Sequence, residues 1–147
     1  MESLRFIKKE SSISMDEKEY YFTVNEIIDK VQKALDIEDF KVINDMERLV
    51  IPSYLFGMIN AFSMRNGATH VQVQAAVVAM LIKRFGYDAK SAVEYFYFLV
   101  DATKKDNHPA INHIICRGLD RYEQIDDSEV IKNEITRIVE IFNEGPN

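Results

Sequence analysis

The sequence contains one cysteine, Cys116, and no tryptophan. A single cysteine excludes an internal disulfide and any metal site made of paired cysteines. Glycine and proline number only five and three, too few for a loop-rich or low-complexity protein. The longest wholly apolar run, residues 75–82, is eight residues long and too short to cross a bilayer.

Positive charge is also scarce. The chain carries 18 lysine and arginine residues against 24 aspartate and glutamate residues, so its formal net charge is −6. Nucleic-acid-binding proteins usually carry a basic stripe, and the sequence shows none. The N-terminal stretch MESLRFIKKESSIS is charged and lacks the apolar core of a signal peptide. We therefore expect a cytoplasmic protein that contacts neither nucleic acid nor a membrane.

Apolar residues are plentiful and recur with a helical period. They make up 47% of the 147 residues, including nine Phe and seven Tyr, which is enough for one ordinary core. Residues 1–22 show no clear helical period, and we expect them to be extended or loose. Residues 23–147 are predicted to form one helical domain. The predicted fold class is all-α, a single-domain bundle of about seven helices.

Capping residues and proline mark the helix boundaries. Thr23 and Glu26 have the spacing of a capping box, which predicts a helix start at Thr23. Pro52 predicts the first turn of another helix, where its missing N–H is not needed. The helix over residues 69–85 is apolar almost all round, which predicts a place in the middle of the domain. The predicted helices cover residues 23–35, 40–50, 52–65, 69–85, 89–103, 109–122 and 128–142.

The stretch RNGATH, from Arg65 to His70, has two interpretations. In the structural one, Arg65 complements the end of one helix, Gly67 caps it, and Thr69 caps the next helix. In the chemical one, the stretch resembles the Arg-Asn-x-x-x-His motif of HEPN-type ribonucleases, which are small all-α proteins. That resemblance implies RNA cleavage without metal, near a dimer interface. A histidine can move a proton from a 2′-hydroxyl, and an arginine can hold the scissile phosphate. We favour the structural interpretation, because capping accounts for every letter.

No other motif predicts a cofactor or a metal site. The glycines stand singly and do not form a phosphate-binding loop. His108 and His113 are five residues apart and do not share a helix face, as a helical metal site requires. Cys116 lies beside an apolar helix stripe and is interpreted as a core thiol, with His113 as its nearest base. We expect no cofactor.

Acidic residues are densest where the last two predicted helices meet. The group comprises Asp120, Glu123, Asp126, Asp127 and Glu129. Acids favour helix N-termini, so capping is the simple interpretation. The alternative is a surface that faces a basic partner, with Tyr87, Tyr95 and Tyr97 as aromatic anchors, since tyrosine buries area while keeping a polar tip. For each tyrosine, packing in the core is the competing interpretation.

The stretch THVQVQAAVVAMLIKRFGYDAKSAVEYFYFLV, residues 69–100, is similar to all-helical immunity proteins of bacterial contact-dependent inhibition and other polymorphic toxin systems. The resemblance extends over about residues 20–143. It implies a protein that binds a cognate toxin domain delivered from a neighbouring cell, often a nuclease, and blocks its active site or substrate groove.

We therefore predict an immunity protein, not an enzyme, that neutralises its toxin through the acidic group and the tyrosines. The acids would complement a basic groove and speed association, and the aromatic side chains would slow dissociation. The alternative from a different class is the HEPN-type ribonuclease, with Arg65 and His70 as its catalytic residues. A regulatory or structural helical module fits the composition equally well.

Overall fold

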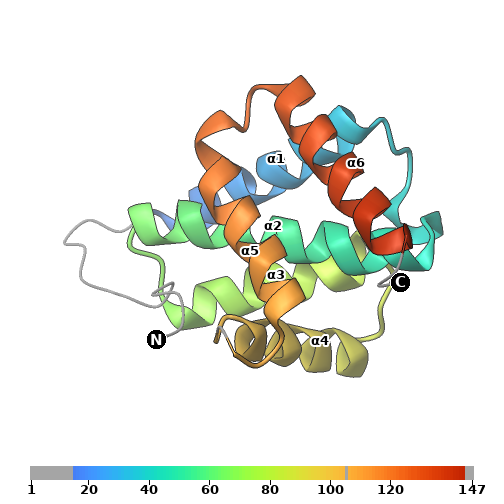
Figure 1. Cartoon of the computed structure of the whole chain (residues 1–147). Coiled ribbons are helices and arrows are strands. Elements are labelled where there is room, and N and C mark those ends of the chain that lie inside the picture. Colours follow the sequence, from blue (N-terminus) through green and yellow to red (C-terminus); the bar gives the residue numbers. More distant parts are fainter. Residues whose placement is uncertain (1–14, 105, 145–147) are drawn as a thin grey trace.

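The computed structural model describes residues 15–104 and 106–144. This part of the chain is all-α, as predicted, with six α-helices, two short 3₁₀-helices and no strand. The elements are α1 (Glu17–Leu35), η1 (Phe40–Val42), α2 (Asp45–Arg65), α3 (His70–Lys83), α4 (Ala89–Ala102), α5 (Pro109–Arg121), η2 (Tyr122–Gln124) and α6 (Ser128–Glu144). α2 runs through the middle of the molecule, α5 crosses it, and α3 and α4 lie next to each other (Figure 1).

α1 begins earlier than the sequence pattern indicates. The predicted helix start at Thr23 is wrong, because Thr23 lies inside α1. Residues 17–22, assigned to the extended or loose N-terminal segment, are helical, whereas residues 1–14 lie outside the described part. Burial explains the difference. Tyr20 extends the apolar face of α1, is fully buried, and places its hydroxyl 2.8 Å from Ser63 Oγ on α2.

The second and third predicted helices are largely one helix, α2, which begins at a capping box formed by Asn44 and Glu47. We predicted that Pro52 occupies the first turn of a helix. It lies inside α2 instead, so this prediction is wrong. A proline there removes the N–H that would bond to the carbonyl of Arg48, four residues earlier. The Tyr95 hydroxyl on α4 donates to that carbonyl instead, at 3.0 Å, so the carbonyl keeps a partner.

α2, and not α3, is the central helix. Every residue of α2 from Val50 to Ser63 is buried, whereas Val71 and Ala75 on α3 are exposed. The prediction that α3 occupies the middle of the domain is therefore wrong. α5 covers α2 at very short range, since a Cβ built on Gly57 would lie 2.0 Å from the carbonyl oxygen of Ile115.

The joints around α3, α4 and α5 agree with the capping signals. Gly67 and Gly86 follow α2 and α3 with φ angles of 66° and 82°, a conformation that favours glycine. The Asp88 carboxylate accepts the Ser91 N–H at the start of α4, and Pro109 occupies the first turn of α5. Several of the predicted site residues lie at or beside these joints.

Candidate partner-binding surface

The joint between α2 and α3 contains the helix caps that the structural interpretation of RNGATH predicts. The Ala68 N–H donates to the Ser63 carbonyl at 3.1 Å, which closes the end of α2 around Gly67. Thr69 and Gln72 then form a capping box at the start of α3. These bonds satisfy backbone groups at the end of α2 and at the start of α3.

Arg65 also contributes to packing and charge balance. Its guanidinium pairs with Glu123 on η2 and lies 5.4 Å from the centre of the Tyr122 ring. His70, the first residue of α3, is exposed at the other end of the joint. In the ribonuclease interpretation Arg65 holds a phosphate; in the structure its guanidinium pairs with the Glu123 carboxylate.

The predicted acidic group lies together at the joint between α5 and α6. Asp120 belongs to α5, Glu123 to η2 and Glu129 to the first turn of α6, with Asp126 and Asp127 between them. All five residues are exposed. The structure therefore brings the predicted acids to one place on the surface.

Three of these five carboxylates form ion pairs. The pairs are Asp120–Arg117 at 3.5 Å, Asp126–Lys30 at 2.7 Å, and Glu123–Arg65. Asp127 accepts the Val130 N–H at 3.3 Å and so caps α6, as the simple interpretation predicts. Glu129 has no ion pair with a described residue. The local excess of negative charge is smaller than the number of acids indicates.

Two of the three predicted tyrosines are used inside the fold. The Tyr87 ring lies 4.6 Å from the Arg48 guanidinium and meets the Tyr95 ring edge-on, with 5.5 Å between ring centres. Tyr95 bonds to the Arg48 carbonyl, and burial raises the pKa of its hydroxyl. Tyr97 differs, because it is 56% exposed on α4. Of the three, Tyr97 is the one whose side chain is mainly available to a partner.

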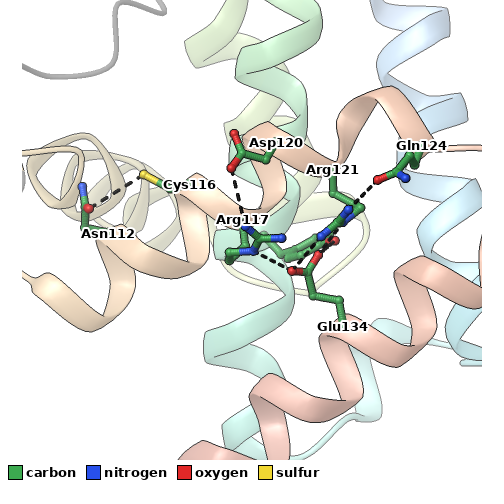
Figure 2. A network of polar contacts seen from close by, with 8 residues as sticks. Asn112, Cys116, Arg117, Asp120, Arg121, Gln124 and Glu134 are labelled. Carbon is green, nitrogen blue, oxygen red and sulfur yellow. Dashed lines mark hydrogen bonds and ion pairs between the residues drawn. The ribbon is translucent and has the colours of Figure 1, made fainter.

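A polar network around Glu134 was not predicted (Figure 2). Its carboxylate accepts hydrogen bonds from the Tyr54 hydroxyl at 2.7 Å, Arg117 Nε at 2.6 Å and Arg121 Nε at 2.8 Å. Burial alone would raise the pKa of Glu134, but the hydrogen bonds from Arg121, Tyr54 and Arg117 lower it to about 2. The i, i+4 spacing of the two arginines on α5 was the available signal. The network ties α2, α5 and α6 together beneath the acidic group.

An apolar groove lies between α3 and α4, on the side of α3 that faces away from the core. Its volume is about 500 Å³. The lining residues are Val71, Ala75, Val78, Ala79, Ile82 and Val93, together with Gln74 and Lys83. A second groove, of about 410 Å³, lies between α3 and α1 and shares Ala75, Ala79 and Lys83. A surface helix usually turns polar residues outward, so this face of α3 departs from the ordinary pattern.

The chain matches a family model described as Immunity protein 48 over residues 19–143. The chain belongs to the immunity protein 48 family. This match confirms the predicted resemblance, and an immunity function implies that the protein binds a cognate toxin. No curated protein and no solved structure matches the chain.

In this immunity protein 48 family member, Cys116 and His108 contact neighbouring side chains of the fold. The Cys116 Sγ lies 3.8 Å from Asn112 Oδ1 (Figure 2), and burial, followed by Asp120, raises the pKa of the thiol. A raised pKa reduces the thiolate that nucleophilic chemistry needs. His108, which precedes α5, places its Nε2 atom 3.2 Å from an oxygen of the Asp101 carboxylate on α4. The described residues include no cluster of three or more side chains suited to a metal ion, and no described helix has the length and hydropathy of a membrane span.

Proposed function

We propose that this immunity protein acts in the cytoplasm against a nuclease toxin of a contact-dependent inhibition or other polymorphic toxin system. The observation that carries the nuclease assignment is the gathering of five exposed carboxylates at the α5–α6 joint of a chain whose net charge is −6. A nuclease binds phosphates through a basic groove, and carboxylates held together attract the same cations. Occupation of that groove excludes nucleic acid.

The ion pairs within the acidic group are compatible with this role. The Asp126 side chain is 82% exposed in its pair with Lys30, and the Glu123 side chain is 64% exposed in its pair with Arg65. Exposed pairs of this kind contribute about 0–1 kcal/mol, so an arginine of the toxin can replace the internal base at small cost. The acids therefore speed association, and the tight contact comes from elsewhere on the surface.

The test uses the toxin domain encoded by the adjacent gene. Isothermal titration with a catalytically inactive form of that domain is expected to give one binding site. Nucleic-acid digestion by the active form is expected to stop at an equimolar amount of immunity protein. Absence of binding heat, or a toxin that does not degrade nucleic acid, contradicts the proposal.

The role of the acids is tested separately by association rates. Glu129→Lys reverses a charge that has no ion pair with a described residue, and Glu140→Lys reverses an exposed charge elsewhere on the same helix. We expect Glu129→Lys to slow association by about threefold at low salt and Glu140→Lys to have a smaller effect, because steering depends on charges near the contact. Equal effects of the two variants would mean that only the overall charge matters.

A further inference from the structure

We propose that the groove between α3 and α4 is where this protein binds an amphipathic helix of its toxin. This inference rests on the proposed function, since the occupant belongs to the toxin. Six of the eight lining residues are apolar, although they lie on the surface. Val71 is 75% exposed, and Tyr97 on α4 lies one helical turn beyond the lining residue Val93. Apolar side chains gathered on one exposed helix face provide area that a protein partner can bury.

The shape of the groove suits a helix. Seven of its eight lining residues belong to α3 and one, Val93, to α4. α3 contains 14 residues, a length of about 21 Å at 1.5 Å per residue. A partner helix of about four turns can lie along such a groove and place apolar side chains at positions i, i+3 or i+4, and i+7. Ala75 and Ala79 line the outer face of α3 with small side chains, which lets a second backbone approach closely.

The charge at one end of the groove defines the chemistry of the occupant. Lys83 is the one charged lining residue, and it makes no ion pair with any described residue. At the other end Val71 follows the α2–α3 joint, where Arg65 pairs with Glu123 of the acidic group. The matching helix therefore has an apolar stripe and an acidic residue that pairs with Lys83.

The experiment compares groove variants with matched controls in the full-length protein. Val71→Lys and Ala75→Arg place a charge in the groove. Val42→Lys changes a valine that is 78% exposed on η1, and Ala110→Arg changes an exposed alanine on α5. The probe is the inactive toxin domain from the adjacent gene, and the readout is its Kd by isothermal titration. We expect the groove variants to raise Kd about tenfold or more, and the controls to change it less than about twofold. Melting temperatures of all four variants show whether the fold is retained.

Each outcome separates this inference from the proposed function. If the wild-type protein binds and the groove variants bind equally well, the groove is not the docking site and toxin binding stands. If the wild-type protein does not bind at all, the proposed function and this inference both fail. Light scattering on the free protein tests whether a second copy of the chain occupies the groove. If the wild-type protein is a dimer and Ala75→Arg is a monomer, the groove binds another copy of the chain and the proposal is overturned.

Discussion

The hydroxyl of Tyr95 takes the place of the backbone N–H that Pro52 lacks. It donates to the Arg48 carbonyl at 3.0 Å, from a different helix. Because Pro52 lies inside α2, this carbonyl has no donor at its usual position in the helix. Tyr95 thus links the first turn of the central helix α2 to α4.

Tyr95→Phe is expected to lower the free energy of unfolding by about 1–2 kcal/mol, because the carbonyl of Arg48 is left unsatisfied. Urea denaturation measures the change. Tyr97→Phe, at a tyrosine that is 56% exposed, is the matched control and should change stability by less than about 0.5 kcal/mol. Equal losses in the two variants would show that the hydrogen bond contributes nothing measurable.

A second test combines Tyr95→Phe with Pro52→Ala. Alanine restores an N–H at position 52, which can donate to the Arg48 carbonyl within the helix. The loss caused by Tyr95→Phe should therefore fall by roughly half or more in the Pro52→Ala background. An unchanged loss in the double-mutant cycle would mean that Tyr95 stabilises the protein through ring packing alone.

Gly57→Ala and Gly118→Ala are expected to destabilise the protein, although alanine normally favours a helix by about 1 kcal/mol over glycine. A Cβ on Gly57 would lie 2.0 Å from the Ile115 carbonyl oxygen, and a Cβ on Gly118 would lie 2.0 Å from that of Tyr54. Separating α2 from α5 should cost about 1–3 kcal/mol for either variant. Thermal and urea denaturation decide the sign, and a gain in stability would contradict the close crossing.

Glu134→Gln is expected to reduce stability by about 2 kcal/mol at pH 7, because Arg117 and Arg121 lose a charged acceptor. The pKa of Glu134 is lowered from 4.5 to about 2 in the folded state. Its contribution is therefore complete above about pH 4.5 and disappears as the pH falls toward 2. The difference between wild type and variant should shrink over that interval in urea titrations. Glu140→Gln, at an exposed position of α6, should show no such narrowing.

Wild type and His70→Ala are expected to be equally inert when incubated with total RNA. The structure uses Arg65 in an ion pair with Glu123 and uses Thr69 as a helix cap. Gel analysis of the RNA after incubation, with and without chelator, measures the activity. Cleavage by the wild type that His70→Ala abolishes would instead support the ribonuclease alternative.

Local signals in the sequence predicted the helical class and several boundaries correctly. Gly67, Thr69, Asp88 and Pro109 mark helix ends because their effects act within a few residues of the chain. The acidic group is also local, and its members lie within ten positions of one another. The sequence therefore predicted correctly that these five acidic residues lie close together.

The errors concern interactions between distant segments. Pro52 continues α2 because Tyr95, far along the chain, satisfies Arg48. The central position of α2 depends on the close contact between Gly57 and the backbone of α5. A single glycine in a sequence does not indicate which distant segment will pack against it. The apolar circumference of α3 was interpreted as a sign of burial. It instead leaves an exposed groove, which sequence periodicity cannot separate from a buried face.

The pairing of α1 with α6 bears on the timing of synthesis. The first described helix of the chain packs mainly against the last described one, so the packing of α1 is incomplete until residues 128–144 have left the ribosome. A nascent chain stopped before Ser128 would lack Glu134 as well as this cover. Any toxin binding that needs the complete helical domain can therefore begin only after α6 has been synthesised and has docked against α1.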